Sequence, residues 1–246
     1  KSDTMTFCSV AQGGGKVFAA IACAGSTPKA VKDGLYALRQ ADGGVAWSLP
    51  GDWGGVSFDG RHLYAARVEG RKDVKLHCLE PADGKALWKI NAPDPVHHPP
   101  AHGRGVCVVV TDKGALCAVA TEGPRAGKSL LWSGGMEPPF RRWEGWAYNT
   151  WTPPRNSVLA LALGAGENGV VVAASGRSVR CLDLKTGRPV QELPWDPKLG
   201  DACNPVIANG RLVVNGDNGA VCYGESDKPA AKPGLGLGAD KKSEGK

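Results

Sequence analysis

Five aromatic side chains and two arginines crowd into one short stretch of the sequence, residues 140–151. The whole chain has eight Trp, four Tyr and four Phe, so nearly a third of its aromatic residues lie in this stretch. Rigid aromatic rings beside arginine offer a large contact area at low entropic cost, which is typical of recognition surfaces on loops. The candidate binding residues are Arg141, Arg142, Trp143, Trp146, Tyr148 and Trp151.

A structural role for this aromatic stretch is the alternative. In that interpretation the stretch packs against its own sheet as a lid, and the tryptophan rings fill gaps. Arg141 and Arg142 would then stack on Trp143 or Trp146 as cation–π pairs that serve packing alone. The residue types do not decide between these two interpretations.

Three of the five histidines fall within the segment Val96–His102, at His97, His98 and His102. Such a cluster suggests a metal site, but adjacent histidines on an extended strand point to opposite faces and do not both ligate one ion easily. We therefore predict no metal site. A polar turn is the simpler interpretation of this segment.

The other motifs that carry chemistry are missing from the sequence. There is no Gly-x-Ser-x-Gly, no Gly-x-x-x-x-Gly-Lys and no His-Glu-x-x-His, so we predict no catalytic residue, although the question of an enzyme stays open. None of the eight cysteines forms a Cys-x-x-Cys pair, which argues against zinc and against an attached c-type haem. A disulfide between Cys107 and Cys117 across a hairpin is left open.

The composition indicates which secondary-structure elements hold these residues. Of 246 residues, 35 are glycine, about twice the usual share of roughly 7%, which favours many short strands joined by turns and disfavours a helical bundle. No apolar run is long enough to span a membrane. The net charge of +6 is spread along the chain without a basic stripe, so we predict no nucleic-acid partner.

An internal repeat organises the chain. Residues 34–47 end in Asp-Gly and Trp47, and residues 74–88 end in Asp-Gly and Trp88. Further copies begin near residues 114, 178 and 219; the third reaches Trp132, and the fourth has Gln191 in the tryptophan position. In this alignment Cys78 and Cys181 occupy the position of Ala37 and Ala118, where a cysteine acts as a small hydrophobic residue.

Each copy of the repeat follows a second short β-branched or aromatic run. Asp-Gly and Asn-Gly pairs at 59–60, 168–169 and 209–210 mark tight hairpin turns, because these residues tolerate positive φ. A period of about 40 residues with up to four antiparallel strands is typical of the blade of a β-propeller. We therefore predict an all-β fold of four-stranded blades.

The repeats from Leu35 to Trp47 and from Leu76 to Trp88 resemble the PQQ-like repeat of quinoprotein-type β-propellers. The resemblance extends to the propeller lipoproteins of the outer-membrane barrel-assembly machinery, which hold protein partners. It implies that Trp47, Trp88 and Trp132 dock on the neighbouring blade. A large aromatic residue that recurs once per unit is also more typical of packing than of chemistry.

The predicted domain organisation follows from the extent of the repeat. Residues 1–224 form about five PQQ-like blades, with an aromatic insert at 133–156. Propellers of this family close with more blades than five, so we expect either part of a larger propeller or an unusual closure. Residues 225–246 are rich in Gly, Lys, Pro and Ala and are predicted to be a flexible tail or linker.

The resemblance also has implications for a bound cofactor and for a central channel. Aligning His98-Pro99 with Asn204-Pro205 implies that His98 and Asn204 line the mouth of a central channel. Quinoprotein alcohol dehydrogenases clamp pyrroloquinoline quinone with a disulfide between adjacent cysteines and a calcium ion, and no two cysteines here are adjacent. We therefore predict no cofactor, with pyrroloquinoline quinone and calcium kept as the alternative.

Taken together, these features predict a non-catalytic PQQ-like β-propeller that binds or scaffolds protein partners. The resemblance implies a bacterial protein outside the cytoplasm, in the periplasm or cell envelope. The alternative is a quinoprotein oxidoreductase that holds pyrroloquinoline quinone over the channel. The sequence names neither the partner nor the oligomeric state.

Overall fold

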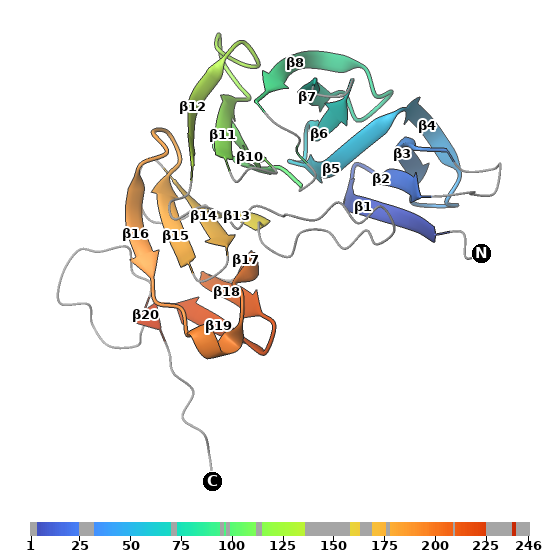
Figure 1. Ribbon diagram of the computed structural model, residues 1–246. Helices are drawn as coiled ribbons and strands as arrows, with labels where there is room; N and C mark the ends of the chain where they lie inside the picture. Colours follow the sequence, from blue (N-terminus) through green and yellow to red (C-terminus); the bar gives the residue numbers. More distant parts are fainter. Residues whose placement is uncertain are drawn as a thin grey trace. The chain divides into compact units, whose positions relative to one another are not determined.

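A computed structural model of the chain describes most residues that the repeat covers (Figure 1). The described residues are 4–24, 32–69, 73–93, 96, 99–111, 115–135, 158–162, 169–175, 178–208, 210–224 and 238–239. They form two compact units, Lys1–Trp151 and Thr152–Lys246. Each unit consists of four-stranded antiparallel sheets, which confirms the predicted all-β class and the four-stranded blades.

The first unit contains three sheets. Their strands follow chain order from one edge to the other, β1-β2-β3-β4, β5-β6-β7-β8 and β9-β10-β11-β12. The strands are β1 (Thr4–Gly13), β2 (Lys16–Ala24), β3 (Gly34–Arg39), β4 (Val45–Pro50), β5 (Asp52–Phe58), β6 (Leu63–Val68), β7 (Val74–Leu79), β8 (Ala86–Ala92), β9 (Ala101–Gly103), β10 (Val106–Val110), β11 (Ala115–Ala120) and β12 (Leu130–Gly135).

The second unit contains two sheets of the same topology and one short helix, η1 (Pro197–Leu199). The strands are β13 (Val158–Ala162), β14 (Val170–Ser175), β15 (Ser178–Asp183), β16 (Pro189–Leu193), β17 (Cys203–Ala208), β18 (Arg211–Gly216), β19 (Gly219–Gly224) and β20 (Gly238–Ala239). The short strand β20 pairs with Tyr223 and Gly224. Two residues of the predicted tail therefore belong to a sheet.

The turn between the third and fourth strands is the same in several sheets. The N–H groups of Gly43, Gly84 and Gly187 each donate to the carbonyl four residues back, at 2.8 Å. All three glycines have φ between +69° and +77°, a left-handed conformation that costs other residues roughly 1–2 kcal/mol. The repeated Asp-Gly or Thr-Gly of the sequence is therefore required by the turn.

Apolar faces of neighbouring sheets form the cores. Phe18, Leu35 and Ala37 of the first sheet pack on Leu63 and Leu79 of the second. The opposite face of the second sheet packs on the third through a cluster that includes Tyr64, Cys78, Cys107, Cys117 and Val119. In the second unit, Val172 and Cys181 pack with Leu212, Val214 and Tyr223. Each sheet is thus buried on at least part of a face, as blades stacked side by side require.

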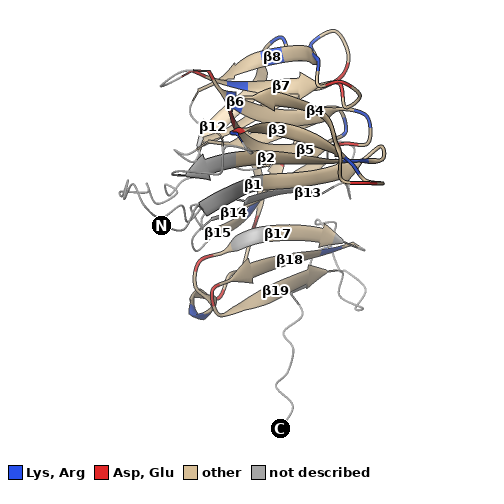
Figure 2. Cartoon of the chain, turned by 90° about the vertical axis from the view of Figure 1, so that its right-hand side faces the viewer, with Lys and Arg blue, Asp and Glu red and all other residues tan. Residues whose placement is uncertain are grey.

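Charged residues lie mostly at turns and strand ends. Figure 2 shows basic and acidic residues of the described sheets interspersed rather than gathered on one strand face. Within the described residues no helix has the length and apolar character needed to cross a membrane.

A candidate ligand pocket beside the docked tryptophans

Most of the residues predicted as binding sites lie outside the part of the chain that the structure describes. This holds for His98 and for the whole candidate loop, Arg141, Arg142, Trp143, Trp146, Tyr148 and Trp151. The backbone of Asn204 lies in β17, and its side chain is not among those described. The predicted loop and channel mouth therefore stay predictions.

The three repeat tryptophans occupy equivalent positions in the outer strands. Each lies opposite a small residue of the third strand, and a register shift follows directly after that residue. Gln191 takes the same place in the fourth sheet. The pairs are Ala37–Trp47, Cys78–Trp88, Ala118–Trp132 and Cys181–Gln191. The register confirms the alignment of the repeats, including the equivalence of Cys78 and Cys181 with alanine.

Trp47 and Trp88 each contact the turn of the next sheet. The Trp47 indole Nε1–H donates to the carbonyl of Pro81 at 3.1 Å, and the ring lies over Gly84, where an added Cβ would come within 3.0 Å of Cε3. Trp88 lies over Gly127 in the same way, and an added Cβ there would come within 2.7 Å of the Trp88 Cβ. A glycine without a side chain is what lets each ring approach the backbone.

A pocket opens next to this contact, where the apolar interface of the first two sheets ends. Along β7, Leu79 belongs to the interface core, while His77, two residues earlier on the same face, lies in the pocket. Across the sheet, His77 lies opposite Ala65 on β6 and opposite Lys89 on β8. At this level of the sheet the side chains of β7 and β8 are therefore polar rather than apolar. Successive side chains of a strand point to opposite faces, so Leu79 and His77 lie on the same face of β7. The pocket forms where the side chains on this face change from apolar to polar, at one end of the interface.

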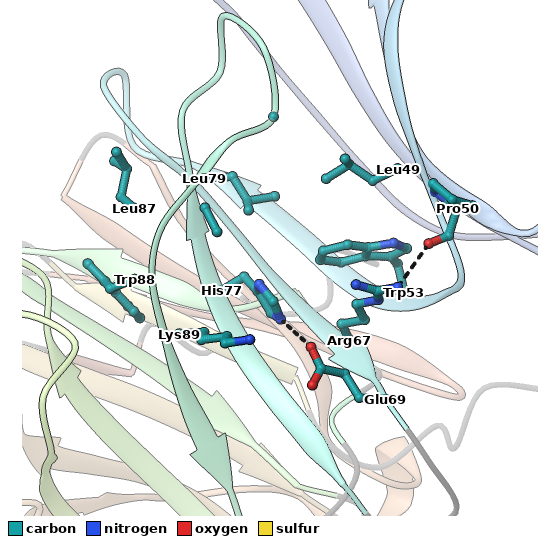
Figure 3. A pocket seen from close by; sticks show the side chains of 12 residues that line it. Leu49, Pro50, Trp53, Arg67, Glu69, His77, Leu79, Leu87, Trp88 and Lys89 are labelled. Atoms are coloured by element: carbon teal, nitrogen blue, oxygen red, sulfur yellow. Dashed lines mark hydrogen bonds and ion pairs between the residues drawn. The ribbon is translucent and has the colours of Figure 1, made fainter.

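The pocket has a volume of about 510 Å³, within the range of known small-ligand sites. Figure 3 shows Trp53, Arg67 and His77 grouped together, with Glu69 and Lys89 beside His77. The residues that line it are Leu49, Pro50, Trp53, Arg67, Glu69, His77, Leu79, Gly84, Ala86, Leu87, Trp88 and Lys89.

His77 is only 4% exposed, yet neither ring nitrogen has a hydrogen-bond partner. Its Nε2 lies 3.6 Å from Glu69 Oε1, beyond ordinary hydrogen-bond distance, and its ring meets the Trp53 ring edge-on at 5.2 Å. Burial lowers the pKa of His77 to about 4, although the Glu69 carboxylate opposes this shift. At neutral pH the imidazole is therefore uncharged, with one N–H donor and one bare acceptor nitrogen.

Trp53 and Arg67 form the second polar wall of the pocket. The Arg67 guanidinium lies 5.4 Å from the centre of the Trp53 ring, a cation–π contact, and its Nη2 donates to the Pro50 carbonyl at 3.3 Å. Arg67 Nε and the buried Trp53 Nε1 have no hydrogen-bond partner. Both groups can only donate a hydrogen bond, so this wall of the pocket carries two N–H donors without an acceptor.

The charges around the pocket are unbalanced. Glu69 forms an ion pair with Lys75, and that hydrogen bond holds the pKa of the Glu69 carboxyl below its usual range. Arg67 and Lys89 line the same pocket, and neither forms an ion pair with a carboxylate within 4 Å among the described residues, although Lys89 also lowers the pKa of Glu69. The pocket therefore carries a net positive charge once Glu69 and Lys75 are counted together.

The described cysteines are suited to packing rather than chemistry. Cys78, Cys107, Cys117 and Cys181 are buried and belong to no disulfide, so Cys107 and Cys117 are not bridged. Burial raises the pKa of Cys78 to about 12 and that of Cys181 to about 11, and it also raises that of Cys107. Thiolates, the reactive form, are therefore rare at neutral pH.

Trp53, Arg67, Glu69 and His77 were not predicted from the sequence as functional residues. A weak signal was present, because His77 occupies the repeat position that holds Tyr36, Cys117 and Arg180 in other sheets. The residue type at this position differs between sheets while the strand register stays the same. The position can therefore take a different role in each sheet. Among the described residues, no group of three or more His, Cys, Asp or Glu side chains is arranged to hold a metal ion.

The fold and the repeat define the class of protein: an all-β chain of four-stranded propeller-type blades whose repeats resemble the PQQ-like repeat. Residues 31–133 match a family model described as outer membrane protein assembly factor BamB. This match, together with the structural likeness below, confirms the PQQ-like resemblance of the repeats. No curated protein sequence matches the chain significantly.

Solved structures of propellers share the fold. BamB from Moraxella catarrhalis is 16% identical with a TM-score of 0.59; the match covers 87% of this chain and 56% of that one. The β-propeller domain of Cps50 (Swd1) from Myceliophteria thermophila is also 16% identical with a TM-score of 0.59, over 98% of this chain and 71% of that one. The WD40 propeller of Doa1 reaches 0.55 at 16% identity, over 90% and 64%. The chain thus spans little more than half the length of the BamB structure.

Proposed function

We propose that this chain is a non-catalytic PQQ-like propeller module that binds or scaffolds protein partners outside the cytoplasm. The observation that carries the proposal is the match of residues 31–133 to a family model described as an outer membrane protein assembly factor. Assembly requires partners, and blades tied to one another by docked tryptophans offer a rigid frame for holding them.

Two features support this proposal, a pocket in the structure and an aromatic stretch in the sequence. The pocket between the first two sheets is open, donor-rich and positively charged, which is what a recognition site for a protein segment requires. The aromatic stretch at 140–151 supplies the residue types that dominate binding energy at protein interfaces. We propose the aromatic stretch as a second contact region.

Affinity capture tests the binding role. The full chain, immobilised through one terminus, is incubated separately with envelope and cytoplasmic extracts, and retained proteins are identified by mass spectrometry with and without excess free chain as competitor. The expected result is one or a few proteins that are retained from the envelope extract and released by the competitor. Retention of nothing competable, or of cytoplasmic proteins alone, would overturn the proposal.

Replacement of the aromatic side chains tests the second contact region. A variant with Trp143, Trp146 and Trp151 all changed to Ala is expected to keep the far-ultraviolet circular dichroism of the parent and to lose captured protein. If the variant unfolds, the stretch serves packing, and the contact region is wrong.

The non-catalytic part of the proposal has its own test. A ligand that binds only the folded form must raise the melting temperature. We expect pyrroloquinoline quinone with calcium, at high concentration, to leave the melting temperature of the chain unchanged. A rise that requires both would favour the oxidoreductase alternative.

A further inference from the structure

We infer that the pocket lined by Trp53, Arg67 and His77 binds a segment of a partner protein that presents an acidic side chain next to apolar residues. This inference rests on the proposed function as a protein-binding module, and it adds the chemistry of the partner and the residues that recognise it. It concerns the first unit alone, whose residues supply every wall of the pocket.

Unpartnered buried groups are the first argument. A buried polar atom without a hydrogen bond is unfavourable, and four such atoms belong to three residues that line this one pocket: Trp53 Nε1, Arg67 Nε and both ring nitrogens of His77. A ligand that supplies their partners recovers that cost on binding. Trp53, Arg67 and His77 come from β5, β6 and β7, so their backbone positions are fixed before a ligand arrives.

The kind of partner follows from the mixture of donors and acceptors. Trp53 Nε1 and Arg67 Nε only donate, whereas neutral His77 donates from one nitrogen and accepts at the other. An inorganic anion supplies acceptors alone and leaves one His77 nitrogen unpartnered. A peptide supplies both carbonyl acceptors and N–H donors, so it can complete the set.

The charge specifies an acidic side chain. Glu69 is neutralised by Lys75, which leaves the Arg67 guanidinium and the Lys89 ammonium facing the pocket. In a partly buried site this positive potential attracts a carboxylate and repels a lysine or arginine. Charge-assisted hydrogen bonds to Arg67 add to the attraction.

Apolar walls specify the neighbours of that acidic residue. Leu49 and Pro50 border the pocket on the β4 side, and Leu87 on β8 is 48% exposed at its rim. Exposed leucine next to unpartnered donors matches a segment that alternates apolar and acidic residues. The volume of about 510 Å³ admits several side chains of such a segment.

Peptide titration tests the inference. The probes are acetyl-Leu-Glu-Leu-amide, the matched acetyl-Leu-Gln-Leu-amide, and sodium acetate as a bare carboxylate. The readout is the indole N–H signal of Trp53 in ¹⁵N–¹H spectra of the full chain, assigned by comparison with Trp53→Phe. The glutamate peptide is expected to shift this signal saturably, the glutamine peptide to bind about tenfold more weakly, and acetate more weakly still, because each lacks part of the ligand.

Two lysines of one hairpin provide a matched pair of variants. Lys89 lines the pocket and Lys85 lies on the adjacent turn outside it, and both are exposed, so neither replacement is expected to disturb folding. Lys89→Gln should weaken binding of the glutamate peptide several-fold, and Lys85→Gln should leave it unchanged. Arg67→Met should abolish binding, with its circular dichroism and melting temperature as the check on folding.

Several outcomes would overturn the inference. These are equal binding of the glutamate and glutamine peptides, equal effects of the two lysine variants, or no shift of the Trp53 signal with any peptide. Tighter binding of acetate than of the peptide would assign the pocket to small carboxylates instead. If affinity capture succeeds while these peptide tests fail, the pocket inference alone is wrong; if capture fails while the peptide binds, the proposed function is wrong.

Discussion

Replacing Gly127 with alanine tests how tightly the sheets are joined. Gly127 has φ of +62°, and the Trp88 ring of the preceding sheet lies directly on it. An alanine Cβ would overlap Trp88 Cγ and Cδ2, so the ring must move out of the interface that it shares with Tyr64. Gly43 is the control: it also precedes an outer strand with a left-handed φ, +69°, but nothing lies within 4 Å of an added Cβ.

The expected magnitudes separate the two effects. Both alanines carry the left-handed backbone cost of roughly 1–2 kcal/mol. Gly127→Ala carries in addition the cost of overpacking a filled interface, typically about 1–3 kcal/mol. We therefore expect Gly43→Ala to lower the free energy of unfolding by about 1–2 kcal/mol, and Gly127→Ala by about 2–5 kcal/mol.

Urea unfolding followed by tryptophan fluorescence and circular dichroism measures both values. Adding Trp88→Ala to each glycine variant completes a double-mutant cycle, which isolates the contact between the ring and the glycine. In the Trp88→Ala background, Gly127→Ala should cost no more than Gly43→Ala. The account of blade docking is refuted if the two glycine variants are equally stable with Trp88 present.

Three further predictions concern the titratable groups. His77→Leu should change the pH dependence of stability. The pKa of His77 is about 4 when folded and near 6.5 when unfolded, so the free energy of unfolding of the parent should fall by up to about 3 kcal/mol between pH 6.5 and 4. Urea unfolding should show no such fall for the variant. Tyr64→Phe removes the hydroxyl that donates to Asp59 Oδ2 at 2.7 Å. Although burial alone raises the pKa of Asp59, hydrogen bonds from the His62 N–H and this hydroxyl hold it below its usual range, so the variant should begin to lose stability at a higher pH during acid titration. In iodoacetamide labelling followed by peptide mapping, the half-buried Cys222 should react before Cys78 in the folded chain, and equal rates would contradict the packing assigned to the buried thiols.

The repeat made much of the fold predictable from sequence. The spacing of Asp-Gly and tryptophan aligned Trp47 with Trp88 and Ala37 with Cys78, and the strand register confirms that alignment. It succeeded because both signals are local: a glycine sets the turn, and the next outer strand follows at a fixed distance. The fourth strand of the last sheet was not predicted, since Gly238–Ala239 has no strand-forming pattern of its own.

The pocket was not predictable in the same way. Trp53, Arg67 and His77 come from three strands, and each is an ordinary residue for a half-buried sheet position when taken alone. What distinguishes them is that buried nitrogen atoms lack partners, which depends on the packing of two sheets and on no spacing in the chain. The sequence drew attention instead to the aromatic stretch from Phe140 to Trp151, because that density is visible without a structure.

Site-specific photo-cross-linking tests most directly that this propeller holds a protein partner at the pocket. Leu87 and Val190 each precede the tryptophan-equivalent position of an outer strand, and they are 48% and 49% exposed. With benzoylphenylalanine at either position in the full chain, exposed to the envelope extract, Leu87 should cross-link to a partner segment that contains Asp or Glu, and Val190 should not. Equal cross-linking at both positions, or none at Leu87, would contradict the account.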